Sequence, residues 1–239
     1  MSLTIVIPAY NAARHIAGVL ARIDALGECQ LAQVVVVNDG STDDTSEQVR
    51  RANFQRCPLT LLERPVNGGY GAALKDALDA ARQTDPELVA CVHADGQYSP
   101  EVLPALCSAL RTQQLDLLQG SRIASGTALD GGMPVYKYVG NALLNLLENH
   151  TLNLAMTDYH SGYLIYGRRT LALPFRELSN SFDFDLEVIA SARARGLSVG
   201  EAPIPTHYGD EVSHLNPLTY GLRVLRVMWN YRRGRYAAT

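Results

Sequence analysis

Four consecutive valines, residues 34–37, most constrain what this chain of 239 residues can fold into. Because valine is β-branched, a run of this kind favours an extended strand. A strand that is apolar on both faces must be covered on both faces, as in a parallel sheet between two layers of helices. The valine run therefore predicts a sheet with helices on both faces, which is an α/β fold.

The N-terminal half repeats the same alternation of short apolar runs and longer helical patterns. Strands are expected at residues 3–7, 34–37, 59–62, 88–92 and 115–118, and helices from 16, up to 49, at 71–82 and at 100–111. Four or five such repeats in about 120 residues predict a doubly wound, mostly parallel sheet. Because crossovers between parallel strands are right-handed, the carboxyl ends should meet at one edge, where ligands bind.

The second half of the chain is less regular. After Arg122, residues 123–134 are rich in Gly, Ser and Asp and predict a loop. Helices are expected at 136–154, 184–195 and 218–236, and strands at 162–166 and 197–203. We divide the chain into one catalytic domain, residues 1–215, and a basic helical extension, residues 216–239.

Composition narrows the classes of function. A net charge of -3 argues against binding to nucleic acid, which normally shows a basic excess. No basic and apolar leader resembles a signal peptide, and no run of about 18 apolar residues suggests a membrane span. The four cysteines have no CxxC spacing, so no zinc knuckle or dithiol redox site is indicated. These features favour a cytoplasmic protein.

Polar, turn-forming residues follow three of the expected strands. They are Pro8, Tyr10 and Asn11 after the first, Asp39 after the second, and His93, Ala94, Asp95 and Gln97 after the fourth. Asp39 can accept hydrogen bonds from a base or ribose, or can close its own Asp-Gly turn. Asp95 and Gln97 can offer oxygens to Mg²⁺ or Mn²⁺ on a phosphate, and an ordinary Asp-Gly turn is the alternative.

A glycine-rich segment opens the helix expected at residues 71–82. Backbone N–H groups around Gly68 and Gly71 can cradle a diphosphate at the helix N-terminus, and a simple tight turn explains the glycines equally well. The segment lacks the third glycine of a dinucleotide fingerprint and the lysine of a P-loop. An NAD-dependent dehydrogenase is therefore disfavoured.

Together these segments resemble glycosyltransferase family 2, and within it the polyprenyl-phosphate and dolichyl-phosphate sugar transferases. The resembling pieces, in the family's order and spacing, are IVIPAYN at 5–11, VVNDGSTD at 36–43, NGGYGAA at 67–73, ADGQYSP at 94–100 and GSR at 120–122. The likeness covers about residues 3–215. It implies a GT-A fold with a nucleotide diphospho-sugar lying across the carboxyl edge of the sheet.

The resemblance also implies roles for individual residues. Its donor site consists of Pro8, Tyr10 and Asn11 beside the base, Asp39 on the uracil or guanine and ribose, and Asp95 with Gln97 on the metal. Arg122 would lie near the sugar or its phosphate. The family usually has Asp-Ala-Asp where this chain has His93-Ala94-Asp95, so His93 is either a donor to ribose or phosphate, or a packed side chain. The family also often has Glu where Ala12 stands.

Three later segments extend the resemblance. Residues 158–163 resemble the Ser-Gly-aromatic strand near the acceptor. Residues 181–187 lie where related enzymes carry a catalytic base, which makes Asp183 the first candidate and Asp185 the second; an acidic first helical turn is the alternative. Residues 208–216 resemble a loop that closes over the donor phosphates. His214 in that loop would complete the metal site and favour Mn²⁺, or would face solvent.

We therefore expect a metal-dependent, inverting transfer of a hexose from a UDP- or GDP-sugar to an acceptor. The metal and Arg122 would stabilise the leaving diphosphate. A hydroxyl acceptor needs a base such as Asp183, whereas a phosphate acceptor is already ionised.

The basic last helix with Trp229 is compatible with a polyprenyl-phosphate acceptor at the inner membrane surface. The alternative is a helix docked on the core with a solvated basic face. Two other functions stay open. One is a non-catalytic nucleotide-sugar-binding module, which His93 favours. The other is a sugar nucleotidyltransferase, which would need a glycine-rich loop with a basic residue after the first strand, where this chain has Pro8-Ala9-Tyr10-Asn11. The oligomeric state is left open as well.

Overall fold

The computed structural model describes residues 2–27, 30–126, 135–205 and 217–237. One sheet of seven described strands runs through the molecule in the order β3-β2-β1-β4-β6-β5-β7. The strands are β1 (Leu3–Ala9), β2 (Leu31–Asn38), β3 (Leu59–Glu63), β4 (Leu88–Cys91), β5 (Leu117–Ser121), β6 (Leu164–Gly167) and β7 (Val199–Pro203). The strand β6 is antiparallel to β4 and β5, and the other strand pairs are parallel. The predicted mostly parallel sheet is confirmed.

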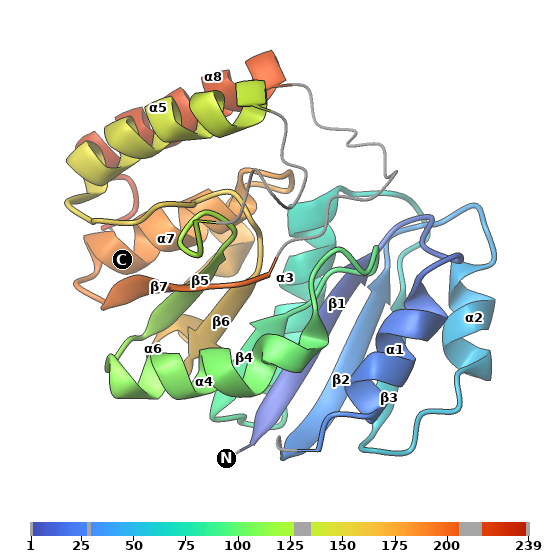
Figure 1. Ribbon diagram of the computed structural model, residues 1–239. Coiled ribbons are helices and arrows are strands. Elements are labelled where there is room, and N and C mark those ends of the chain that lie inside the picture. Colours follow the sequence, from blue (N-terminus) through green and yellow to red (C-terminus); the bar gives the residue numbers. More distant parts are fainter. Residues whose placement is uncertain (1, 28–29, 127–134, 206–216, 238–239) are drawn as a thin grey trace.

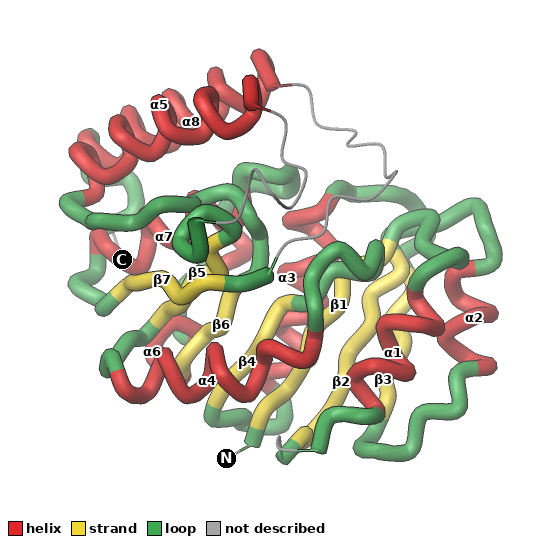
Figure 2. Tube along the Cα trace, in the orientation of Figure 1, coloured by secondary structure: helices red, strands yellow, loops and turns green. Residues whose placement is uncertain are grey.

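Helices cover both faces of the sheet, as Figure 2 shows. They are α1 (Ile16–Asp24), α2 (Thr45–Arg51), α3 (Tyr70–Arg82), α4 (Leu103–Thr112), α5 (Val135–Leu152), α6 (Arg168–Leu171), α7 (Phe184–Ala194) and α8 (Pro217–Arg232), with 3₁₀ turns η1 (Pro100–Val102) and η2 (Phe175–Glu177). One face packs against α1, α2 and α4, and the other against α3, α7 and α8. The predicted α/β class is therefore confirmed.

The four valines of β2 explain this two-sided packing. Val34 and Val36 join the core beneath α1 and α4, while Val35 and Val37 join the core beneath α3 and α7. All four side chains are fully buried. Because successive side chains of a strand point to opposite faces, a run of valines can supply both cores at once.

The expected elements of the N-terminal half agree with the structure within a few residues, and the later start of β5 has a local cause. That strand was expected from residue 115 and begins at Leu117. Gln114 has a left-handed backbone, with φ of 53°, and the Leu115 N–H donates to the Leu110 carbonyl. Leu115 thus closes the end of α4 and is not yet part of the strand. The short α6 and η2 were not expected.

The helices α5 and α8 lie side by side at the end of the molecule toward which the parallel strands run (Figure 1). Helix α8 turns Val224, Val227 and Met228 into the core that it shares with α7. The boundary expected at residue 216 lies outside the described residues. None of the helices in the described ranges is long and apolar enough to cross a lipid bilayer.

Candidate active site

The loops after β1 and β2 are tied together by Asn11. Its backbone is left-handed, with φ of 49°. The Thr42 N–H donates to the Asn11 side-chain carbonyl at 2.9 Å, and the Asn11 N–H donates to Ser41 Oγ at 2.9 Å. Tyr10 beside it is 50% exposed, and Pro8 is partly buried in the strand. This lip therefore has a fixed backbone and one aromatic ring open to a ligand.

Asp39 follows β2 and is almost fully buried. Its carboxylate accepts the Gly68 and Gly69 N–H groups, both at 2.9 Å, and lies 2.8 Å from Arg64 Nε. The glycine loop thus binds a carboxylate of this chain itself, so these two amides serve to orient Asp39. A carboxylate offers about four lone-pair sites, so the two N–H donors leave acceptor capacity for a ligand.

Gly71 owes its identity to close packing. A Cβ atom at this position would lie 2.4 Å from the Ser179 carbonyl oxygen and 2.8 Å from Phe184 Cβ. The N-terminus of α3 can therefore approach the segment before α7 only without a side chain here. The glycine loop therefore connects Asp39, at the end of β2, with the segment before α7. These contacts explain the glycines without a bound diphosphate.

The segment after β4 carries the expected metal ligand. The Gln97 N–H donates to Asp95 Oδ1 at 3.0 Å, and Gly96 between them has φ of 76°, so an Asp-Gly turn is present. Ala94 is buried in the core. Among the described residues, no three His, Cys, Asp or Glu side chains lie close enough to share a metal, and His214 lies outside them. Asp95 fits a hard cation that takes its remaining ligands from phosphate and water.

His93 packs in an aromatic environment. Its ring meets Tyr70 and Tyr98 edge-on, with centroid distances of 5.8 and 5.1 Å, and its Nε2 lies 3.2 Å from the Gly162 carbonyl oxygen. Burial lowers the pKa of His93, and Arg122 lowers it further, although Asp95 and the Gly162 carbonyl oppose this shift. His93 is therefore a neutral hydrogen-bonding group at neutral pH.

Gly162 reaches this site because β6 is antiparallel to its neighbours. The residues that precede β6 lie at the edge where β4 and β5 end. Gly162 has φ of 72°, and a Cβ atom there would lie 2.8 Å from the His93 ring and 3.1 Å from Asp185 Oδ2. Only glycine combines this backbone with this contact.

Arg122 is fixed by a buried bidentate ion pair with Asp158. The Arg122 Nε lies 2.7 Å from Asp158 Oδ2, and Nη2 lies 2.9 Å from Oδ1. Burial alone would raise the pKa of Asp158, but the Arg122 guanidinium outweighs it and holds the pKa below its ordinary value. The guanidinium is thus held rigidly at the carboxyl end of β5. Sequence reasoning placed Asp158 within a resembling segment but gave it no role.

The two candidate bases sit in different surroundings. Asp183 Oδ1 accepts Ser179 Oγ at 2.8 Å and pairs with Arg223 of α8 at 2.9 Å. Asp185 is buried, and its Oδ2 accepts the Tyr70 hydroxyl at 2.8 Å, while Oδ1 has no hydrogen-bond partner among the described residues. Burial raises the pKa of Asp185 to about 7, although the Tyr70 hydrogen bond opposes this. By environment, Asp185 is the one that resembles an acid–base group.

Residues 4–172 match the profile of the family described as Glycosyl transferase family 2. The chain belongs to this family. The predicted resemblance is therefore confirmed over more than half of the chain.

Two relatives of this family-2 chain are named as glycosyltransferases. The low-salt glycan biosynthesis hexosyltransferase Agl6 of Haloferax volcanii is 31% identical over 230 residues, which are 95% of this chain and 53% of Agl6. This chain thus spans about half the length of that relative. The undecaprenyl-phosphate mannosyltransferase of Micrococcus luteus is 28% identical over 207 residues, 85% of this chain and 83% of the relative.

The fold has close counterparts among solved structures. Glucosyl-3-phosphoglycerate synthase from Mycobacterium tuberculosis, in complex with Mn²⁺, UDP and glucosyl-3-phosphoglycerate, matches with a TM-score of 0.70 at 20% identity. The match covers 96% of this chain and 79% of the synthase. The predicted GT-A fold is thereby confirmed.

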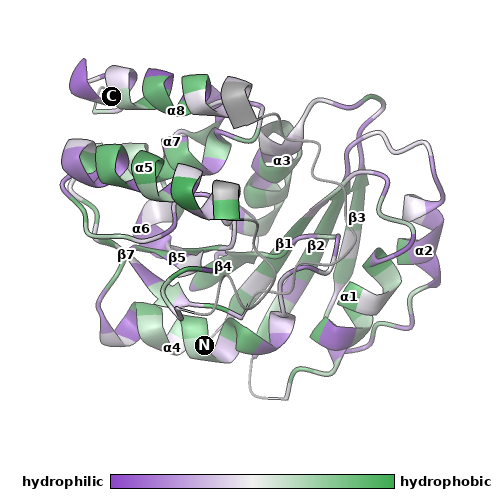
Figure 3. Cartoon of the chain, turned by 45° about the horizontal axis from the view of Figure 1, so that its top comes forward, coloured by the Kyte–Doolittle hydropathy of each residue, from purple (hydrophilic) through white to green (hydrophobic). Residues whose placement is uncertain are grey.

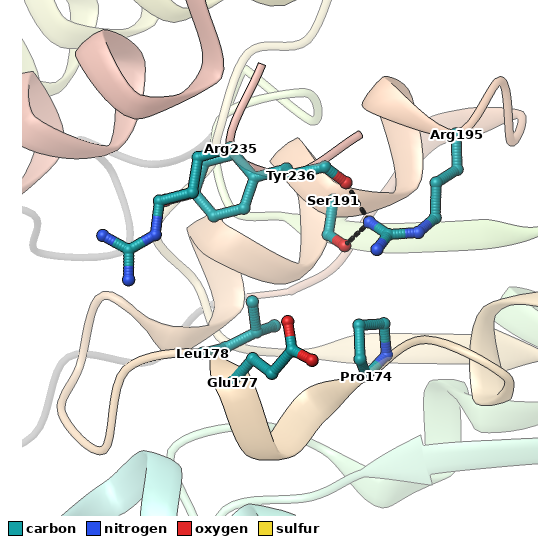
Figure 4. A pocket seen from close by; sticks show the side chains of 7 residues that line it. All are labelled: Pro174, Glu177, Leu178, Ser191, Arg195, Arg235 and Tyr236. Carbon is teal, nitrogen blue, oxygen red and sulfur yellow. Dashed lines mark hydrogen bonds between the residues drawn. The ribbon is translucent and has the colours of Figure 1, made fainter. Parts of the chain in front are cut away.

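Four aromatic residues of the site had been given no role from the sequence. Tyr70 stacks on Phe182, with centroids 5.9 Å apart, and Tyr98 stacks on Tyr163 at 5.5 Å. All four lie within segments that resemble the family, but the resemblance assigned them no contact. A small cavity of about 70 Å³ lined by Arg195, Arg235 and Tyr236 contains none of the expected site residues (Figure 4).

Proposed function

We propose that this chain transfers a hexosyl group from a UDP- or GDP-sugar to a polyprenyl phosphate, with inversion and with a divalent metal. The observation that carries the proposal is the fixed Arg122 guanidinium at the same sheet edge as Asp39 and Asp95. Membership of the family supports the reaction class. The Micrococcus relative, named as an undecaprenyl-phosphate mannosyltransferase, supports the acceptor class.

The donor half of the proposal assigns each strand end one task. Tyr10 and Asn11 border the base, and the remaining lone pair of Asp39 accepts from the base or ribose. Asp95 holds the metal, to which Gln97 and His214 are proposed further ligands. When bound, Mg²⁺ or Mn²⁺ would supply Lewis-acid stabilisation of the departing nucleotide diphosphate. Neutral His93 uses its single N–H on the Gly162 carbonyl, so its other ring nitrogen would accept a hydrogen bond from a donor hydroxyl such as that of the ribose.

The acceptor half rests on a groove beside Arg122. A groove of about 280 Å³ is lined by Ile123, Tyr138, Ala142, Leu146, Met156 and Thr157, together with the amides Asn145 and Asn149. Its lining includes Ile123, which follows Arg122, and Thr157, whose Oγ1 lies 2.7 Å from Ser121 Oγ, so the groove adjoins the backbone at Arg122. Leu146, which also lines the groove, is 70% exposed. A charged donor followed by an apolar path suits a phosphate that carries an isoprenoid chain.

A phosphate acceptor removes the need for a catalytic base. A phosphate monoester has a second pKa near ~6, so it is mostly ionised at neutral pH. Asp183 is engaged by Arg223 and Ser179, and Asp185 is buried beneath Tyr70. On this proposal neither carboxylate removes the acceptor proton, and Asp183 would become essential only with a hydroxyl acceptor.

Product analysis with paired acceptors tests the proposal. The purified chain is incubated with UDP- and GDP-hexoses, Mn²⁺ and either undecaprenyl phosphate or undecaprenol, and lipid products are identified by mass spectrometry. We expect a hexosyl phospholipid from the phosphate and no product from the alcohol. Asp183→Asn should keep most of this activity, and the exposed control Asp85→Asn should keep all of it.

The other outcomes contradict distinct parts of the proposal. If undecaprenol accepts the hexose and Asp183→Asn abolishes that transfer, the acceptor is a hydroxyl instead of a phosphate. Donor hydrolysis without lipid product would reject polyprenyl phosphate. No consumption of any donor would favour the non-catalytic nucleotide-sugar-binding module.

A further inference from the structure

Exposed apolar side chains are concentrated on two helices. Ten large hydrophobic residues of the described chain are exposed, and seven of them lie on α5 and α8: Val135, Val139, Leu143, Leu146, Leu222, Leu225 and Trp229. Within each helix they are spaced by three or four residues, so each set forms one stripe. We call these seven side chains the outer face. Figure 3 shows the two helices adjacent, with hydrophobic turns along both.

The outer face is not a substitute for a missing core. Helix α8 already buries Val224, Val227 and Met228, and α5 buries Asn145 and Glu148 on the side toward the molecule. Each helix therefore has one side packed inward and a second, apolar side turned outward. Exposed apolar patches of this kind mark interaction surfaces in folded proteins.

The charge around the outer face has one sign. Glu148 is the single acidic residue of the two helices, and it is fully buried 3.3 Å from His160. The arginines of α8 and of the turn after it are exposed: Arg223, Arg226, Arg232, Arg233 and Arg235. Arg233 lies over the Trp229 ring, 5.8 Å from its centroid. Exposed arginines thus border the apolar stripe, with no exposed carboxylate on either helix.

We propose that the outer face docks this chain on a lipid bilayer that contains anionic lipids. An apolar stripe with a tryptophan and bordering arginines matches the boundary between acyl chains and anionic headgroups. A second copy of the chain fits less well, because a symmetric contact would bring two sets of arginines together. The apolar side chains would enter the boundary, and the arginines would meet the lipid phosphates.

Docking in this way would explain how the site meets a lipid. Leu146 belongs to the outer face and also lines the groove that adjoins the backbone at Arg122. A polyprenyl phosphate in the bilayer could enter the groove at Leu146 with its phosphate toward the guanidinium. This consequence rests on the proposed function, whereas the docking itself does not.

Vesicle sedimentation tests the docking directly. The full chain is mixed with vesicles of phosphatidylcholine, with or without a third of phosphatidylglycerol, and the bound fraction is measured. We expect binding to the anionic vesicles that weakens with salt, and little binding to the neutral ones. Leu143→Asp should lower the partition coefficient about tenfold or more, because a leucine leaves the apolar phase. Arg226→Gln should lower it about fivefold on anionic vesicles alone.

A matched control keeps the test specific. Leu143 and Val66 are both 68% exposed, and Val66 lies on the loop between β3 and α3, away from the two helices. Val66→Asp should bind anionic vesicles like the wild type. Leu222→Asp on α8, 67% exposed, should fail like Leu143→Asp, and unchanged melting temperatures would exclude misfolding as the cause.

Three results would overturn the docking. The first is equal binding by Leu143→Asp and Val66→Asp, and the second is no binding of the wild type to anionic vesicles. The third is a concentration-dependent dimer that Leu143→Asp abolishes without any vesicle binding, which would make the outer face an interface between copies. Transfer to a short, water-soluble polyprenyl phosphate separates this proposal from the proposed function. Leu143→Asp should retain that transfer. If the wild type shows no such transfer, only the proposed function is rejected.

Discussion

The two halves of the sheet edge hold their polar side chains in different ways. At β2 and β4, backbone amides of turns hold the carboxylates: Gly68 and Gly69 bind Asp39, and Gln97 binds Asp95. At β5 and β6, Asp158 also accepts two backbone N–H groups, but it is fixed in addition by a bidentate ion pair with Arg122, 36 residues away in the sequence. The first half is therefore fixed mainly by turns next to the strands, whereas the second depends on how distant segments of the chain assemble around it.

This difference predicts how each half responds to substitution. A side chain held by amides keeps those partners when a neighbour is removed. A fully buried carboxylate that loses a bidentate arginine loses its counter-charge, and an uncompensated charge in a protein interior lowers stability strongly. The predictions below compare the halves, beginning with the largest effect.

Removal of the proposed metal ligand should have the largest effect. Asp95→Asn should lower the turnover number on the order of 10³-fold, because charge on the departing diphosphate is no longer neutralised. The variant should melt near the wild-type temperature, since Asp95 is only partly buried. Steady-state kinetics across a Mn²⁺ titration measures the effect, and unchanged metal dependence would remove Asp95 from the metal site.

The two arginine–aspartate pairs should differ in stability. Each carboxylate keeps two backbone N–H donors when its arginine side chain is removed: residue 122 and His160 for Asp158, and Gly68 and Gly69 for Asp39. Arg122→Ala removes a bidentate pair from a fully buried carboxylate and should lower the free energy of unfolding by about 3–5 kcal/mol. Arg64→Ala removes one contact made by an arginine that also pairs with Asp76 and should lower it by about 1 kcal/mol. Urea unfolding of both variants gives the comparison. Equal losses would show that the two halves are held alike.

The pKa of Asp185 should make stability depend on pH. Burial raises this pKa from 3.8 to about 7, so the folded state keeps a proton that the unfolded state has released. Stability from this group is therefore fully present below about pH 4 and is lost as the pH rises toward 7. Asp185→Asn should gain about 3 kcal/mol over the wild type between pH 5 and pH 8, as one pKa unit is about 1.4 kcal/mol.

Asp183→Asn provides the control for this pH effect. It removes a carboxylate that pairs with Arg223 and bonds to Ser179, so it should lose stability at pH 8. Unfolding of both variants at the two pH values would settle the contrast. A gain in Asp183→Asn, or none in Asp185→Asn, would contradict the environments described for the two carboxylates.

Two glycines with similar backbones should separate strain from contact. Gly126 and Gly162 have φ of 73° and 72°, but a Cβ atom at Gly126 would meet nothing within 4 Å. Gly126→Ala should cost about 1–2 kcal/mol from the backbone alone. Gly162→Ala should cost more, because the methyl group would also displace the His93 ring. Equal melting temperatures would mean that the Gly162 contact relaxes freely.

Local sequence signals predicted most of the donor half. The valines of β2 required a covered sheet, and the turn residues Asp39 and Asp95 follow their strands directly, so periodicity and turn chemistry located them. The partner of Asp39 in the glycine loop was not foreseen. A pattern of glycines indicates a tight backbone but not which carboxylate its N–H groups bind.

The acceptor half could be predicted only in part. Residues 162–166 read as a strand, but its antiparallel direction depends on pairing with β4 and β5, which periodicity does not reveal. Asp158 lies 36 residues from Arg122 in sequence, so no local spacing connects them. The sequence pattern did not assign the apolar residues of α8 to separate sides of the helix. They form two sides, one with Val224 in the core and one with Leu225 outside.

The central claim is that the strand ends of β1, β2 and β4 form a metal-dependent nucleotide-sugar site. Thermal unfolding with a panel of UDP- and GDP-sugars, with and without Mn²⁺, tests it on the wild type and on Asp95→Asn. A ligand that binds only the folded state raises the melting temperature. We expect a rise with sugars of one nucleotide, only with Mn²⁺, that disappears in Asp95→Asn. No rise with any nucleotide sugar, or an equal rise in Asp95→Asn, would contradict the assignment.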